Sequence, residues 1–222
     1  MIIRYLTIYE PCTGEYTDRR SRFIAHLAHA ENEAEALAFI AGMKNTYRDA
    51  RHNCSAFIVA DAAGGPDIVR SNDDGEPSQT AGKPMLDVLQ ASGLRNIVVV
   101  VTRYFGGILL GTGGLVRAYS QAVSECLKNA DPVTEITCTK YALTVDYNAY
   151  GLLTRICAGL GADMGQPEFS DVVKLEISVP DECTGDFLRK IRDAWNGKLI
   201  PEEAGKGILR AAAGTENPGR KV

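Results

Sequence analysis

Cysteine, histidine and tryptophan are scarce in this sequence of 222 residues, which has six cysteines, three histidines and one tryptophan. The cysteines are Cys12, Cys54, Cys126, Cys138, Cys157 and Cys183, and no two lie closer than 12 positions. The sequence therefore has no C-x-x-C pair of the kind that binds zinc or cycles through a disulfide. So few cysteines in a chain of this length do not indicate a disulfide framework. We expect reduced thiols in a cytoplasmic protein.

A surplus of basic residues is also missing. The net charge is −4, with 13 basic against 15 acidic residues up to position 131 and 11 against 13 after it. No overall field therefore draws the protein to nucleic acid, and such a contact would need a local patch. No apolar run approaches the roughly 20 residues of a membrane span. The start, MIIRYLTIYEP, lacks the basic region and long apolar core of a signal peptide. We expect no membrane association.

The first part of the chain alternates predicted strands and helices. Hydrophobic patterning predicts strands at 22–28, 52–60, 67–71 and 97–101, and helices at 31–45, 84–93 and 115–129. The run IVVVV at 97–101 is apolar throughout, which is typical of a strand buried on both faces. We assign residues 1–131 to an N-terminal domain of mixed sheet and helices.

The pattern restarts after Pro132. Strands are predicted at 136–147, 164–169, 172–180 and within 198–210, and helices at 150–161 and 181–195, with Asp181 as N-cap. This β-α-β-β-α-β order predicts a ferredoxin-like domain over 132–210, so the whole protein is of the α+β class. The tail at 211–222 has no periodicity and is predicted to be disordered.

A glycine-rich segment, RYFGGILLGTGGLVR, follows the central strand. Its glycines are Gly106, Gly107, Gly111, Gly113 and Gly114. It is not a P-loop, because Thr112 stands where the lysine must be, and a dinucleotide fingerprint only half fits. The helix predicted from Leu115 nevertheless begins with amides that lack partners, and such amides bind anions. Arg103 and Arg117 would add charge. The competing interpretation is a turn that serves only tight packing.

Asp73, Asp74 and Glu76 precede the second helix. They could ligate Mg²⁺, form a solvated turn, or hold the two arginines in place. His52 and Cys54 share a strand face at roughly 7 Å, set by the strand rise, so a catalytic dyad is not expected. His52 is interpreted instead as a hydrogen-bonded wall of the site. Arg189, Lys190 and Arg192 give the last helix a basic face, either plain solvated surface or an RNA contact.

Four long motifs mark a resemblance to a known family. SRFIAH, HNCSAFIV, NDDGEPSQTAGKPML and VVVVTRYFGGILLGTGGLVRAY occur in the order and spacing of the IMPACT/YigZ family, over roughly residues 15–130. The resemblance implies that the N-terminal domain has the fold of the second domain of ribosomal protein S5. The following segment resembles the family's bacterial C-terminal domain, which is similar to a domain of elongation factor G.

The family's signature carries over onto individual positions of this sequence. These are Arg22, His52, Asp73, Asp74, Gly75, Glu76, Thr80, Ala81, Gly82, Lys83, Arg103, Tyr104, Gly106, Gly107, Gly111, Gly113, Gly114 and Arg117. Gln79 departs from the family's usual GEPSGTAG, where a glycine stands, and it would be strained if the position needs a positive φ. Ser55-Ala56-Phe57 departs too, because the family tends to have aromatic residues at the first and third places.

The resemblance implies a role in translational control, as in eukaryotic relatives. Our first hypothesis is a non-catalytic factor that binds RNA, the ribosome or a translation component. The alternative is an enzyme or binding protein for a phosphorylated small molecule, and a third possibility is a protein-interaction module. The predicted anion-binding residues are Lys83, Arg103, Gly106, Gly107, Gly111, Thr112, Gly113, Gly114 and Arg117. The predicted supporting residues are His52, Asp73, Asp74, Glu76, Thr80 and Tyr104. No metal, cofactor or catalytic group is assigned.

Overall fold

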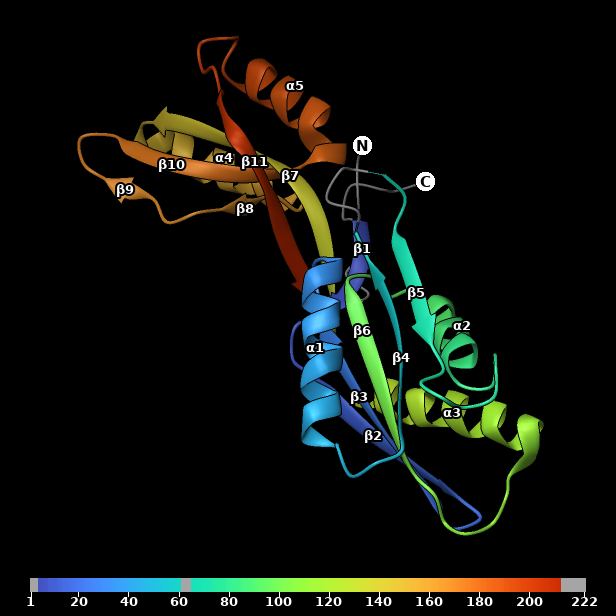
Figure 1. Ribbon diagram of the computed structural model, residues 1–222. Coiled ribbons are helices and arrows are strands. Elements are labelled where there is room, and N and C mark those ends of the chain that lie inside the picture. Colours follow the sequence, from blue (N-terminus) through green and yellow to red (C-terminus); the bar gives the residue numbers. More distant parts are fainter. Residues whose placement is uncertain (1–3, 61–64, 213–222) are drawn as a thin grey trace. The chain divides into compact units, whose positions relative to one another are not determined.

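A computed structural model describes residues 4–60 and 65–212 (Figure 1). Contacts divide the chain into two compact units. The N-terminal unit is Leu6–Val133, and the C-terminal unit is Thr134–Val222 together with Met1–Tyr5. The chain is an α+β protein, as predicted. The predicted disordered tail covers 211–222, but residues 211 and 212 belong to a strand, and 213–222 lie outside the described residues.

The N-terminal unit is built on a five-stranded sheet. Its strands are β2 (Cys12–Asp18), β3 (Ser21–His29), β4 (His52–Val59), β5 (Ile68–Asn72) and β6 (Ile97–Tyr104). Their order in the sheet is β2-β3-β6-β4-β5, with antiparallel neighbours. The predicted central strand is therefore central, and the predicted returning strand at 67–71 is β5, paired with β4. Strand β2 was not predicted.

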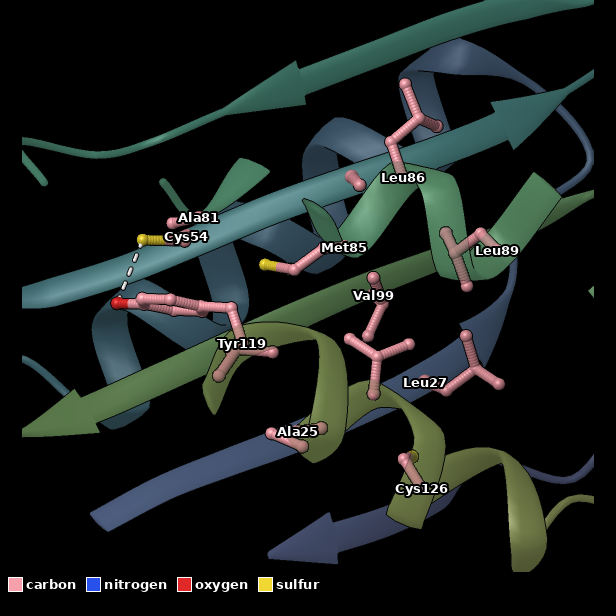
Figure 2. Packing of buried hydrophobic residues seen from close by; sticks show 14 of the residues in the cluster. Ala25, Leu27, Cys54, Ala81, Met85, Leu86, Leu89, Val99, Tyr119 and Cys126 are labelled. Atoms are coloured by element: carbon pink, nitrogen blue, oxygen red, sulfur yellow. Dashed lines mark hydrogen bonds between the residues drawn. The ribbon is translucent and has the colours of Figure 1, made fainter. Parts of the chain in front are cut away.

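Helices cover both faces of this sheet. The helices are α1 (Glu33–Thr46), α2 (Gly82–Ser92) and α3 (Gly111–Lys128). Val99 of β6 packs in one cluster with residues of α2 and α3, whereas Val98 packs in another with Ala36 of α1. Figure 2 shows the first cluster, with Met85 and Leu89 of α2 over the sheet. Because both faces are covered, β6 can be apolar throughout.

The C-terminal unit follows the predicted β-α-β-β-α-β order except that its second predicted strand is divided into two. Its elements are β7 (Pro132–Val145), α4 (Tyr147–Ala158), β8 (Asp163–Met164), β9 (Glu168–Phe169), β10 (Val173–Pro180), α5 (Thr184–Ala194) and β11 (Glu202–Ala212). Strand β10 pairs with β7, β8 and β9, and β11 pairs with β7, an arrangement compatible with a ferredoxin-like domain. The sheet also includes β1 (Arg4–Ile8), which was not predicted.

Two local predictions in this unit are corrected. The strand expected at 164–169 is two strands of two residues each. Asp181 is not the N-cap of α5, because it lies in a short 3₁₀ turn and α5 begins after Cys183. The Asp181 carboxylate instead accepts hydrogen bonds from Thr139 Oγ1 at 2.7 Å and Lys206 Nζ at 3.2 Å. It therefore ties the turn to β7 and β11.

Candidate functional site

The predicted site residues of the N-terminal unit gather at one end of its sheet. Pairing of His52 with Arg103, and of Arg22 with Tyr104, brings the starts of β3 and β4 level with the end of β6. The acidic loop follows β5 and the glycine-rich loop follows β6. Figure 1 shows the glycine-rich loop at the lower end of the sheet, beside the turn that joins β2 to β3, and the acidic loop between β5 and α2. The sequence stretches that carry the motifs therefore meet at one end of the unit.

Asp73 organises the acidic loop around the start of α2. Its carboxylate accepts hydrogen bonds from the backbone amides of Gln79 (2.8 Å), Ala81 (3.0 Å) and Gly82 (2.8 Å). The amides of Ala81 and Gly82 lie at the start of α2, where the helix offers them no internal partner, and a carboxylate there is also favoured by the helix dipole. Asp73 thus fixes the loop and the helix, and both of its oxygens are used within the chain. Thr80 is likewise internal, since its Oγ1 donates to the Pro77 carbonyl at 2.6 Å.

Asp74 connects the loop to β4 and α1. One carboxylate oxygen accepts from the Asn53 amide at 2.8 Å, and the other accepts from Lys44 Nζ at 2.5 Å. The Asp74 carbonyl lies 2.9 Å from His52 Nδ1. Because a carbonyl oxygen can only accept, Nδ1 carries a proton and donates it to this carbonyl. His52 is therefore hydrogen-bonded to the acidic loop.

Cys54 does not form a dyad with His52. Its Sγ lies 3.0 Å from the Asp73 carbonyl oxygen and 3.3 Å from Tyr119 Oη, the contact drawn in Figure 2, and both oxygens are acceptors for its one proton. Burial raises the pKa of this thiol far above its ordinary value. A thiol that stays protonated and hydrogen-bonded in the core is not an activated nucleophile.

Arg103 and Glu76 form a buried ion pair. Arg103 Nη1 lies 2.5 Å from Glu76 Oε1, with side-chain exposures of 8% and 3%. Tyr119 Oη donates to the same oxygen at 2.9 Å. The Arg103 guanidinium lies 5.5 Å from the ring of Phe23 and 5.6 Å from that of Phe105. Of the two arginines that the acidic loop was expected to hold under one of the three alternatives, it holds Arg103 and not Arg117. The Arg103 guanidinium also contacts the ring of Phe105.

The start of α3 differs from the sequence prediction. The helix begins at Gly111 rather than Leu115, so most of the second glycine cluster lies inside its first turn. Its N-cap, Leu110, provides no capping side chain, and no described side chain bonds the amides of 111–114. An open helix start of this kind can accept an anion. Thr112 is exposed within it.

Glycine is needed at some positions of this segment for its backbone conformation and at others for close packing. Gly107 and Gly111 have φ values of 84° and 72°, which side chains rarely adopt. A Cβ on Gly106 would lie 2.0 Å from the carbonyl carbon of Arg20, so that glycine permits close packing. Gly113 has neither reason, because its φ is not positive and no atom lies within 4 Å of an added Cβ. The fold of the N-terminal unit does not itself require glycine there.

The two remaining cationic side chains of the predicted site, Arg117 and Lys83, differ in whether they have an ion-pair partner among the described residues. Arg117 is exposed on α3 and has no hydrogen bond or ion pair with any described residue. Gly113 and Arg117 are four residues apart and share a face of α3. Lys83, exposed at the start of α2, forms an ion pair with Asp87. Tyr104 Oη donates to Asp49 at 3.1 Å and so closes the loop before β4.

Several residues at this end were missed from the sequence. The turn of the β2–β3 hairpin places Arg19 and Arg20 beside the glycine-rich loop, because Gly106 N donates to Ser21 Oγ at 3.1 Å. Arg19 Nη1 donates to the Leu109 carbonyl at 3.0 Å. Only prediction of the hairpin could have revealed these contacts, and its turn lacks the Asn-Gly signal that marks such turns.

This fold and site define a class: two-unit α+β proteins whose loop site combines a buried ion pair, exposed arginines and an open helix start. In the described ranges, no group of three or more His, Cys, Asp or Glu side chains could hold a metal ion. No described helix is long and apolar enough to cross a membrane.

Comparison with known proteins identifies the family of the chain. The Impact N-terminal domain family matches residues 19–127, and a domain of unknown function, DUF1949, matches residues 143–198. The chain belongs to the IMPACT family. It is 37% identical to IMPACT family member YvyE of Bacillus subtilis over 96% of each chain. It is 40% identical to IMPACT family member YigZ of Escherichia coli, over 85% of this chain and 92% of that one.

A solved structure supports the fold. A crystal structure of a hypothetical protein, 34% identical, covers 90% of this chain and 97% of its own, with a TM-score of 0.58. The residue motifs and both units therefore agree in identifying the family.

Proposed function

We propose that the protein is a non-catalytic cytoplasmic factor in translation or its regulation, which binds RNA, the ribosome or a translation component. The observation that carries the proposal is the open start of α3 with Arg117 exposed one turn beyond it. Membership of the IMPACT family supports the link to translation. The bound group is a phosphate, held by the amides of Gly111, Thr112 and Gly113.

Gly113 adds support for an external ligand at this helix start. A glycine in a helix costs about 1 kcal/mol relative to alanine. Neither backbone conformation nor crowding within the described chain explains that cost at Gly113. A ligand that packs directly on the backbone at Gly113 would need this position to have no Cβ. Arg117 on the same helix face then provides the bidentate donors that a phosphate prefers.

The other predicted cations take different parts in this proposal. Lys83 would break its ion pair with Asp87 and bind the phosphate instead. Breaking this pair costs little free energy, because the side chains of Lys83 and Asp87 are both 54% exposed. Arg103 supports the loop from beneath, since its Nη1 bonds Glu76 and its side chain is only 8% exposed. Asp73 and Asp74 keep the neighbouring loop rigid through their bonds to backbone amides.

The alternative, binding of a phosphorylated small molecule, finds less support. A cavity of about 620 Å³ lies in the C-terminal unit, and its charged lining residues are Glu168, Glu176 and Glu202 with Lys174 and Lys198. Three carboxylates against two ammonium groups do not favour a phosphate. The open helix start is instead an exposed surface, which suits a large ligand.

The test is RNA binding by fluorescence anisotropy with a labelled single strand of about 15 nucleotides, at about 50 and about 200 mM salt. Arg117→Ala should weaken binding about five-fold and lower the salt slope by about 0.7, the loss of one phosphate contact. Arg189→Ala is the matched control, since Arg189 is an exposed helix arginine paired with Asp186 on α5. It should change the affinity less than two-fold, roughly the effect of removing remote charge.

Two outcomes would contradict the proposal. Equal RNA affinity of the parent and of Arg117→Ala would show that Arg117 and the start of α3 do not form the binding site. Thermal stabilisation by nucleotides or sugar phosphates, with none by RNA, would favour the small-molecule alternative, because any ligand of the native state raises its stability.

A further inference from the structure

A second surface of the N-terminal unit lies beside the open helix start. It consists of Arg19, Arg20, Phe105, Ile108 and Leu109, and we call it the hairpin–loop surface. Its two segments are held together by the bond from Arg19 Nη1 to the Leu109 carbonyl and by the close approach of Gly106 to the Arg20 backbone. Figure 1 shows the β2–β3 turn and the β6–α3 loop side by side at the lower end of the sheet. This surface is therefore built by specific contacts between distant segments.

Exposed apolar side chains concentrate on this surface. Phe105 is 55% exposed, Ile108 43% and Leu109 79%. Among the described residues of the N-terminal unit, the other exposed large apolar side chains are Val116, next to this surface in sequence, and Leu37 on α1. Single exposed apolar residues are ordinary, but several together mark an interaction site.

Two arginines of the hairpin turn adjoin these apolar side chains, and one acidic residue, Asp18, directly precedes them in the hairpin. No aspartate or glutamate occurs from residue 88 to residue 124. Arg20 is exposed and has no ion pair or hydrogen bond with a described residue, and the recorded bond of Arg19 is to a neutral carbonyl. An acidic partner would therefore meet two guanidinium groups that form no ion pair with a described carboxylate.

The two-residue hairpin turn requires a left-handed backbone at both of its central positions, and arginine occupies both of them. Arg19 and Arg20 have φ values of 44° and 65°, the left-handed conformation that both central residues of a type I′ turn adopt. Asparagine and glycine suit these positions, and arginine does not. Observed strain of this kind points to a functional reason for the residues that bear it.

We propose that the hairpin–loop surface binds a short acidic amphipathic segment of a partner protein. Leucine-, isoleucine- or phenylalanine-like side chains of the segment would pack on Phe105, Ile108 and Leu109, and its carboxylates would bond Arg19 and Arg20. RNA offers no aliphatic surface for Ile108 and Leu109. An anionic membrane would also meet the net charge of −4, whereas a short segment interacts locally. This proposal does not depend on phosphate binding at the start of α3.

The test begins with photo-crosslinking of the full chain carrying benzoylphenylalanine at position 109, in an extract of the organism that encodes it. The matched control carries the same residue at position 37, because Leu37 is 53% exposed on α1. Adducts are mapped to the crosslinked segment, and that segment is synthesised and its affinity measured by anisotropy.

The proposal predicts an adduct at position 109 to an acidic amphipathic segment. Leu109→Ser should weaken the synthetic segment about ten-fold, as expected for a central apolar contact, and Leu37→Ser less than about two-fold. The double variant R19N/R20G should weaken it about five-fold, with a smaller salt dependence. The same variant should raise the urea midpoint, because the turn is no longer strained, so a loss of binding would not reflect unfolding.

Any of four results would overturn the proposal. These are adducts only to RNA or lipid, adducts to a second copy of this chain, no adduct above the position-37 control, or a segment whose affinity is unchanged by both variants. Phosphate binding at the start of α3 would be unaffected by these results, so the two proposals can fail separately.

Discussion

Arg103 and Glu76 form an ion pair of 2.5 Å across 27 residues of sequence, and less than a tenth of either side chain is exposed. The pair joins the end of β6 to the acidic loop, and Tyr119 of α3 donates to the same carboxylate oxygen. Both loops of the candidate site thus depend on one buried contact.

Removing one charge of this pair should be costly. Glu76→Gln leaves the Arg103 guanidinium buried without a counter-charge, so we expect a loss of about 3 kcal/mol in the unfolding free energy of the N-terminal unit. Hydrogen exchange of the β6 amides measures that loss. The one tryptophan, Trp195, lies in the C-terminal unit, and its fluorescence transition should not move.

The exposed pair on α2 is the control for this measurement. Lys83→Ala should cost less than about 1 kcal/mol, because Lys83 and Asp87 are both 54% exposed. Equal losses in the two variants would show that burial does not decide the strength of the Arg103–Glu76 pair.

Replacing Gln79 by glycine should raise the stability of the protein. Its φ of 63° confirms that the position where the family usually has glycine needs a left-handed backbone. Gln79→Gly removes a strain of about 1 kcal/mol and adds some flexibility to the unfolded chain, so we expect a net gain of about 0.5 kcal/mol.

Urea denaturation measures the effect of Gln79→Gly. The neighbouring Ser78, whose φ is not positive, is the control, and Ser78→Gly should bring no gain. A loss of stability in Gln79→Gly would mean that the Gln79 side chain contributes more than the strained backbone costs.

His26 should make the N-terminal unit less stable in mild acid. Burial lowers the pKa of this histidine below its ordinary value of 6.5, and Nε2 is buried with no hydrogen-bond partner among the described residues. The unfolded chain therefore takes up a proton at higher pH than the folded one. The contribution is complete above pH 6.5 and is lost as the pH falls through the lowered pKa.

The measurement is urea denaturation of the parent and of His26→Gln between about pH 8 and about pH 5, on either side of the histidine pKa. The parent should lose more stability across this range than the variant. If the stabilities of the parent and of His26→Gln fell equally with pH, His26 would not be the cause of the loss of stability in acid.

Strong hydrophobic patterns allowed much of the fold to be predicted from the sequence. The run at Ile97–Val101 and the periodic segments of α1 and α2 are where they were expected. Strand β2 was missed because CTGEYTD carries few apolar side chains and alternates half-buried with exposed positions. With β2 unassigned, the hairpin turn at Arg19 and Arg20 could not be foreseen.

The motif residues of the candidate site could be named from the sequence, but their contacts could not. The motifs identified Asp73, Glu76 and Arg103, but sequence spacing does not tell which carboxylate reaches an arginine and which reaches backbone amides. Asp73 caps α2 and Glu76 meets Arg103, and both outcomes follow from the packing of the loop against β4 and α3. The helix start at Gly111 was missed because glycine is a poor helix former.

The most direct test of the central claim is an NMR titration of the ¹⁵N-labelled full chain with a 5′-phosphorylated single-stranded RNA. Saturable shifts of the amides of Gly111, Thr112 and Gly113, weakened by Arg117→Ala, are the predicted result. Shifts confined to the basic face of α5 at Arg189, Lys190 and Arg192, or no saturable shift at all, would contradict phosphate binding at the start of α3.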